Sequence, residues 1–297
     1  MKKEDLIHYA VSNSSNRRTL LKKLAKASAA VTAISAVGVR NVGAQSTTPA
    51  PEDVVQFALN LEYLEAEFYS VATTGQTLEQ RGYTFPGTGQ SGPTTTQYGA
   101  VNFGNNINFT AAVAQNIATD EFEHVQVLRA ALTQNSVTPI AKPAIDLDVL
   151  ASMNASLANE TTFLSLSRIF EDIGLSAYCG GAPFLSGSAY LQNAARITGV
   201  EGLHVANVRL QLARLGIPTT PLDGADVLPP PIGSNFFSTN VANGLCAIRT
   251  PGQVLYLAYG NQAGVTSGGF FPNGVNGVLN MSSAAATSAN LATMPPS

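Results

Sequence analysis

The residues with the clearest chemical potential form two copies of one short pattern, a glutamate followed three positions later by a histidine. Glu121 and His124 form the first pair, and Glu201 and His204 form the second. On a helix, side chains three positions apart project from the same face, so each pair can offer a carboxylate and an imidazole to one point. The chain has three histidines. Because two of them occur in this pattern, the spacing favours a metal site over chance.

Two more glutamates extend this pattern, since each lies in an apolar segment with helical spacing. Burial of an unpaired carboxylate is costly, so each needs a cation or another partner. Along the chain the order becomes Glu, Glu-x-x-His, Glu, Glu-x-x-His. Four carboxylates and two imidazoles can hold two divalent ions, and the mixed ligands suit iron or manganese, with zinc compatible. The predicted ligands are Glu62, Glu121, His124, Glu171, Glu201 and His204. The alternative is that both histidines are core residues hydrogen-bonded to glutamate.

The apolar spacing predicts an all-α protein whose four long helices position these residues. Gly216 is a helix-stop signal, and Thr250 followed by Pro251 predicts a further short helix to residue 259. A long Gly-, Thr- and Asn-rich loop separates the first two helices, over residues 73–109, and a Pro- and Gly-rich extension covers the bundle after residue 216. Three of the helices are predicted over residues 52–72, 110–132 and 188–215. The remaining one, the third along the chain, ends near residue 178, and the sequence does not define its start.

Other charged residues in these helices are expected to face solvent. Glu67, Glu123 and Asp172 fall outside the predicted ligand set and are read as solvated carboxylates. The arginines of the fourth helix are expected on its outer face or at its edges. These are Arg196, Arg209 and Arg214.

The first 44 residues read as a targeting segment with a charge opposite to that of the rest. They carry eight Lys or Arg and two Asp or Glu, and include Arg17-Arg18, which resembles a twin-arginine export signal. A short apolar run follows, and Val42-Gly43-Ala44 is typical of a signal-peptidase site. An amphipathic or disordered tail is the alternative. The chain is predicted to divide into a signal peptide over 1–44, a bundle over 45–216 and an extension over 217–297. The protein is therefore expected to be exported to the periplasm or the extracellular space.

Charge and composition exclude several function classes. Net charge is −3 overall, and beyond residue 44 the only lysine is Lys142, which argues against nucleic acid or an anionic membrane as a partner. No segment beyond residue 44 is apolar for long enough to span a membrane. We find no nucleophilic triad, phosphate-binding loop or dinucleotide fingerprint. Cys179 and Cys246 lack metal-type spacing; a disulfide and two small buried residues both fit the sequence.

Two segments carry a resemblance to a known family. Residues 60–69, Asn-Leu-Glu-Tyr-Leu-Glu-Ala-Glu-Phe-Tyr, and residues 170–174, Phe-Glu-Asp-Ile-Gly, resemble the ferritin-like desiccation-related proteins of the ferritin-like superfamily. The resemblance implies a ferritin-like four-helix bundle. In such bundles a Tyr follows the first-helix ligand by seven residues, as Tyr69 follows Glu62, so Glu65 is expected beside the ligands or partly exposed. The resemblance also implies that Asp120 orients a ligand histidine, His204.

Three functions fit these observations. One is a di-iron or di-manganese enzyme that reacts with oxygen or peroxide in a stress response. Another is a metal-binding or desiccation- and stress-protective bundle without turnover. The last is a structural bundle that keeps the fold with partial or no metal. The sequence leaves the metal, any organic substrate and the oligomeric state open.

Overall fold

Four long helices dominate the computed structural model, which describes residues 48–104, 109–152 and 157–292. The predicted signal segment over residues 1–44 lies outside these ranges. The helices are α3 (Pro51–Thr74), α4 (Thr110–Gln134), α6 (Glu160–Gly181) and α7 (Leu191–Leu215). They confirm the predicted all-α bundle, and the predicted helix boundaries lie within a few residues of the observed ones.

Local sequence signals explain where the long helices begin and end. Pro51 occupies the first turn of α3, and Gly75 ends that helix with a left-handed φ of 75°. At the start of α6, Asn159 and Thr162 form a reciprocal capping box. The predicted stop at Gly216 is confirmed, because this glycine ends α7 with a φ of 65°.

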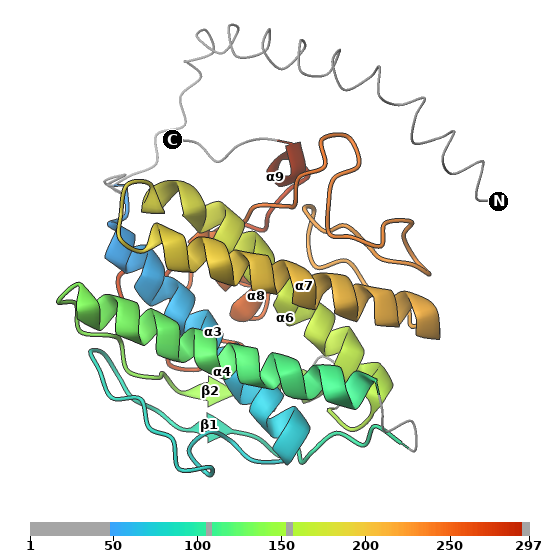
Figure 1. Cartoon of the computed structure of the whole chain (residues 1–297), viewed down its shortest axis with the longest axis horizontal. Coiled ribbons are helices and arrows are strands. Elements are labelled where there is room, and N and C mark those ends of the chain that lie inside the picture. Colours follow the sequence, from blue (N-terminus) through green and yellow to red (C-terminus); the bar gives the residue numbers. More distant parts are fainter. Residues whose placement is uncertain (1–47, 105–108, 153–156, 293–297) are drawn as a thin grey trace, which may run out of the picture. The chain divides into compact units, whose positions relative to one another are not determined.

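The bundle is built from two antiparallel helix pairs, α3 with α4 and α6 with α7, and the two pairs pack on each other through α3 with α6 and α4 with α7 (Figure 1). A long connection joins the helices of the first pair. The second pair is joined by a shorter segment that contains the 3₁₀ helix η1 (Ala182–Leu185). Each pair therefore contributes one Glu helix and one Glu-x-x-His helix to the interior.

Helix α3 is buried on nearly every side, which corrects the prediction that Glu67 faces solvent. Glu67 is fully buried rather than solvated, because the connecting loops cover that side of the helix. Lys142 lies 3.4 Å from Glu67 Oε1 and 2.6 Å from Glu79 Oε1, and the Leu78 N–H donates to Glu67 Oε2. The loops also join through two short parallel strands, β1 (Thr94–Thr95) and β2 (Ile145–Asp146).

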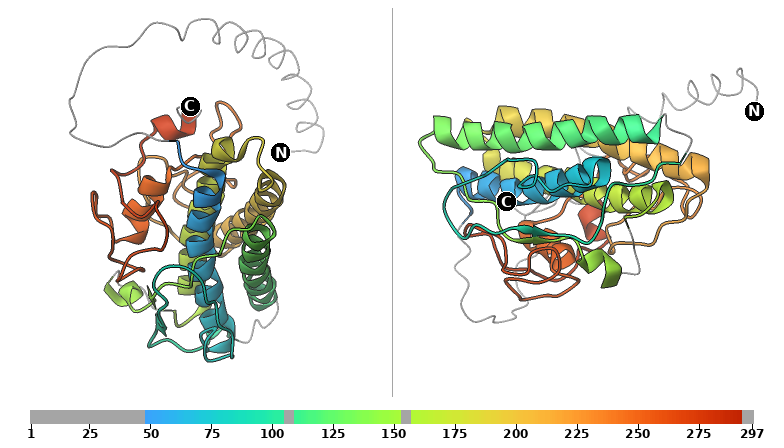
Figure 2. Two further views of the ribbon diagram at one scale, coloured as in Figure 1. Left: turned by 90° about the vertical axis from the view of Figure 1, so that its left-hand side faces the viewer. Right: turned by 90° about the horizontal axis from the view of Figure 1, so that it is seen from below.

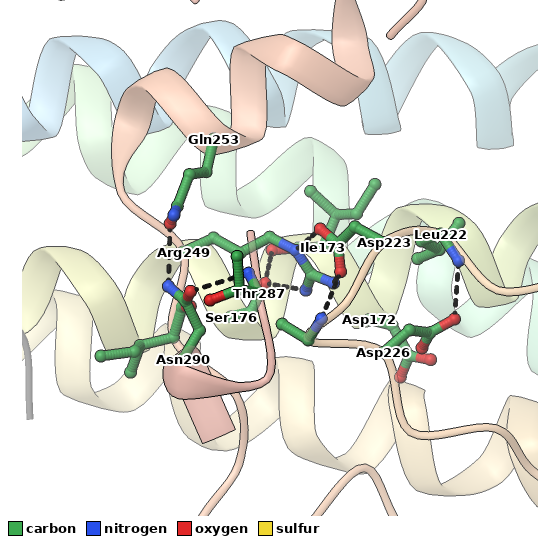
Figure 3. A network of polar contacts seen from close by, with 12 residues as sticks. Asp172, Ile173, Ser176, Leu222, Asp223, Asp226, Arg249, Gln253, Thr287 and Asn290 are labelled. Atoms are coloured by element: carbon green, nitrogen blue, oxygen red, sulfur yellow. Dashed lines mark hydrogen bonds and ion pairs between the residues drawn. The ribbon is translucent and has the colours of Figure 1, made fainter. Parts of the chain in front are cut away.

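The C-terminal extension packs against the bundle, on the opposite side of α3 from α4 (Figure 2). It contains α8 (Pro251–Ala258), which contacts α6, and α9 (Ala289–Ala292); α5 (Val149–Ser152) is a further short helix. The predicted start of α8 is confirmed by a capping box between Thr250 and Gln253. Figure 3 shows how Arg249 fixes the extension: it pairs with Asp223 and donates to Ser176 Oγ on α6.

The extension also explains two wrong predictions of exposure. Asp172 and Arg209 are both buried rather than solvent-facing, and Arg209 Nη1 lies 2.8 Å from Asp172 Oδ2. Arg168 binds the same carboxylate oxygen, at 2.7 Å, and also pairs with Asp226 of the extension. A charge buried by the extension needs such partners.

The remaining predictions of exposure hold, since Glu123, Arg196 and Arg214 are all exposed. None of the helices in the described ranges combines the length and apolar character needed to cross a membrane.

Candidate metal centre

All six predicted ligands lie together in the middle of the bundle, although they come from four helices. Each is between 0 and 6% exposed. They form two overlapping groups, and within each group the potential ligand atoms lie within 4.8 Å of one another. Both groups contain Glu121 and Glu201. The first adds Glu62 and His124, and the second adds Glu171 and His204. This is the arrangement of two adjacent cation sites that share two carboxylates.

Both histidines direct Nδ1 toward the centre of the cluster. His124 Nδ1 lies 3.2 Å from Glu121 Oε2 and 3.3 Å from Glu62 Oε2. His204 Nδ1 lies 3.0 Å from Glu121 Oε1 and 3.3 Å from Glu171 Oε2. The two oxygens of Glu121 therefore face different histidines, which places this carboxylate between the two groups.

Two tyrosines bind Glu62 and Glu171, which each belong to one ligand group only and are called the terminal glutamates here. Each tyrosine binds the carboxylate oxygen Oε1. Tyr69 on α3 donates to Glu171 Oε1 on α6, and Tyr178 on α6 donates to Glu62 Oε1 on α3. Each tyrosine follows the glutamate of its own helix by seven residues but binds the glutamate of the other helix. The pairing of Tyr178 with Glu62 was not predicted, although the same spacing of seven signals it.

Asp120 lies beside His204, where the family resemblance placed it. Its Oδ2 is 3.0 Å from His204 Nε2, so the carboxylate can accept the Nε2–H. This fixes the tautomer in which Nδ1 carries the free lone pair that a metal needs. Val200 occupies the corresponding position before Glu201, so that position of α7 supplies no carboxylate to His124.

Buried polar atoms without a hydrogen bond show whether these residues suit a cation. Several buried atoms of the cluster form no hydrogen bond, although some of them, such as Glu121 Oε1 and His204 Nδ1, lie within ion-pair distance of each other. All of these atoms belong to predicted ligands. They are Glu62 Oε2, Glu121 Oε1, Glu171 Oε2, both carboxylate oxygens of Glu201, and His204 Nδ1. Such atoms cost free energy when left unsatisfied. Oxygen and imidazole donors are the ligands of divalent metals such as iron and manganese, so the cluster fits a divalent metal site.

The protonation of the metal-free cluster reflects its crowded charge. Burial raises the pKa of Glu62 to about 7, with the nearby His124 opposing this shift. Burial also raises the pKa of Glu201 well above its usual value, and the neighbouring glutamates add to the effect. For His124, burial lowers the pKa, but the carboxylates of Glu62 and Glu121 outweigh burial and raise it to about 11. Protons thus occupy the place that metal charge would take.

Comparison with known proteins agrees with this geometry. The family of ferritin-like domains matches residues 51–214, more than half of the chain. The chain belongs to the ferritin-like family. It is also 27% identical over 272 residues to a protein of Nesocodon mauritianus named ferritin-like catalase Nec2, covering 76% of this chain and 83% of that protein. The closer resemblance to desiccation-related proteins stays a prediction.

One more carboxylate of the ferritin-like core lies beside the ligand groups. Glu65 is 5% exposed, so the alternative of a partly exposed side chain is wrong. Its Oε1 and Glu201 Oε2 both lie over Gly174 of α6: a Cβ added at this glycine would lie 2.7 Å from Glu201 Oε2 and 3.1 Å from Glu65 Oε1. Gly174 therefore provides the space into which both carboxylates project. This role of Gly174 was not predicted from the sequence, although the glycine ends the Phe-Glu-Asp-Ile-Gly segment.

Proposed function

We propose that this protein is a di-metal carboxylate protein that holds two iron or manganese ions and decomposes hydrogen peroxide. The convergence of four carboxylates and two imidazole Nδ1 atoms in the bundle core carries the proposal. The similarity to a protein named as a ferritin-like catalase supports peroxide as the substrate. Four negative ligands balance two dications, so the loaded core would carry no net ligand charge.

Glu62 and His124 would hold one ion, and Glu171 and His204 would hold the other. Glu121 and Glu201 would serve both ions, because they belong to both groups. The bound metals would supply Lewis acidity and a reversible change of oxidation state.

The surrounding residues keep the ligand atoms in place. Tyr69 and Tyr178 each occupy one oxygen of a terminal glutamate, which leaves the other oxygen directed at the centre. Asp120 holds His204 with Nδ1 facing inward. The bulky apolar side chains of the four helices exclude bulk water, which strengthens the electrostatic interactions within the site.

A shallow surface hollow offers a route for a small polar oxidant. It has a volume of about 190 Å³ and lies along the seam between α4 and α7. Asp120 and His204 line it, together with Asn116 and Asn207. The hollow therefore reaches one of the proposed ligands, His204, and its polar lining residues could hydrogen-bond hydrogen peroxide.

Metal content and peroxide turnover test the proposal together. We expect about two iron or manganese ions per chain and oxygen release on addition of peroxide. The variant Glu121→Gln removes a shared charge and should lose both. Glu123→Gln is the matched control, since Glu123 lies two positions away on the same helix and is exposed.

Two outcomes would separate the alternatives. Metal binding that depends on Glu121 without any peroxide turnover would favour the non-catalytic metal-binding or stress-protective bundle. Absence of metal after anaerobic reconstitution with iron and with manganese would refute the di-metal proposal.

We further propose that the protein is exported, on the basis of Arg17-Arg18 and the Val42-Gly43-Ala44 site, and that removal of peroxide would be its role in the stress response. Mass spectrometry of the protein from its native host should find an N-terminus at Gln45. An intact N-terminus would contradict export by cleavage.

A further inference from the structure

A second internal space lies between the bundle and the C-terminal extension, on the side of α3 away from α4. It has a volume of about 330 Å³ and is bordered by α3, α6, α8 and the loops of the extension. This volume falls in the range of small-molecule pockets. An apolar cavity of roughly half this size is enough to bind benzene, so there is room for a substituted aromatic ring.

The walls of this cavity are apolar and its opening is polar. Leu64, Phe170 and Leu257 are among the apolar side chains that line it. Thr220 and Asn261 also line it, and both are exposed. The exposed residues mark the mouth, and the buried ones mark the floor.

Glu65 is the one carboxylate in the lining, and it belongs to the floor. Its side chain is 5% exposed, and we find no hydrogen bond or ion pair to it from any residue that the structure describes. A buried carboxyl group without a partner costs free energy. A ligand hydroxyl in the cavity would supply the missing hydrogen bond.

The charges around Glu65 restrict the class of ligand. In metal-free protein, four neighbouring glutamates act on Glu65 electrostatically. With or without metal, the residues that line the cavity include no Lys, Arg or His to pair with an anion, so a second negative charge at this place is disfavoured. A cation would be drawn to Glu65 but would have to give up its hydration among apolar side chains. A neutral polar group meets neither obstacle.

We propose that this cavity binds a small neutral molecule with an apolar body and one hydroxyl group, such as a simple phenol, whose hydroxyl hydrogen-bonds to Glu65. The bound hydroxyl would lie near the proposed metal ligands, because Glu65 Oε1 and Glu201 Oε2 both lie over Gly174. Binding rests on the cavity and on Glu65 alone. It does not depend on the proposed peroxide function and is expected in metal-free and metal-loaded protein alike.

Ligand-observed NMR on the purified full chain tests this site with matched probes. 4-Propylphenol should bind about tenfold more tightly than propylbenzene, which lacks only the hydroxyl. The anion 4-propylbenzoate and the cation 4-propylbenzylammonium should both bind more weakly than the phenol. In Glu65→Leu the phenol should lose its advantage while propylbenzene keeps its affinity.

A second variant keeps the proposal falsifiable if Glu65→Leu fails to fold. Leu257→Trp enlarges a half-buried wall residue on α8, so it should abolish binding of both neutral probes and leave the metal content unchanged. Equal binding of phenol and propylbenzene by the unmodified chain would overturn the proposal. So would absence of binding, tighter binding of either charged probe, or binding that survives in Leu257→Trp.

Discussion

Two glycines within helices give a sharp test of the metal centre, because they differ in what a methyl group would meet. A Cβ at Gly174 on α6 would lie 2.7 Å from Glu201 Oε2, whereas a Cβ at Gly202 on α7 would meet nothing within 4 Å. Both substitutions to alanine improve helix propensity by about 1 kcal/mol. Only Gly174→Ala intrudes on the proposed ligands.

The size of the intrusion sets the expected effect. To restore an ordinary contact, Glu201 Oε2 must retreat from 2.7 to 3.4 Å from the new Cβ, a shift of about 0.7 Å. The end of a glutamate can move this far in metal-free protein, so the stability of metal-free Gly174→Ala should stay within about 1 kcal/mol of the unmodified protein. A bound metal tolerates a displacement of only about 0.2 Å. We therefore expect metal affinity to fall about 10- to 100-fold.

Gly202→Ala is the control, and it should behave in the opposite way. It should stabilise the metal-free protein by about 1 kcal/mol, or about 2–4 °C in Tm for a domain of this size. Its metal affinity should not change. Calorimetric unfolding and competition with a metal chelator measure the two quantities separately. Metal affinity in Gly174→Ala equal to that of the unmodified protein would refute the placement of Glu201 as a shared ligand.

Three further predictions concern protons, sulfur and ligand orientation. The pKa of Glu62 is raised to about 7 in metal-free protein, so this carboxylate takes up a proton below pH 7 that a metal must displace. Acidification below pH 7 should therefore weaken metal binding about tenfold per pH unit for each proton displaced. Chelator competition from pH 5.5 to 8 measures this, and an affinity that does not change with pH would contradict it. Cys179 Sγ and Cys246 Sγ lie 3.0 Å apart, so mild oxidation should form a disulfide that stabilises the folded chain by roughly 4 kcal/mol. Thiol titration of the unfolded protein detects the disulfide, and the Tm reports its effect on stability. Two thiols that persist after oxidation would contradict this prediction. Asp120→Ala should weaken the site of His204 about tenfold and spare the other; stepwise metal titration distinguishes this from equal weakening of both.

Local sequence patterns were enough to find the four helices. Apolar residues at helical spacing predicted them, and Gly216 and the Thr250-Pro251 pair correctly marked a helix end and a helix start. These features depend on neighbours in the chain, so no knowledge of the tertiary structure was needed. The six predicted ligands come together for the same reason: helical spacing places each of them on the apolar face of its helix, and that face is directed into the bundle.

The exposure of charged residues could not be read in the same way. Glu67, Asp172 and Arg209 are buried because loops and the extension, remote in sequence, cover the helix faces that carry them. Irregular segments have no periodicity to predict where they pack. Their coverage turns α3 into a helix buried on nearly all sides.

The sequence by itself determined the helices, the Glu and His spacing and the family resemblance, because each is a property of residues close together along the chain. Only the tertiary structure decided which groups meet across helices. It paired Tyr178 with Glu62, brought Glu65 and Glu201 together over Gly174, and formed the apolar cavity beneath the extension. These contacts depend on how helices and loops pack, which side-chain spacing along one helix does not specify.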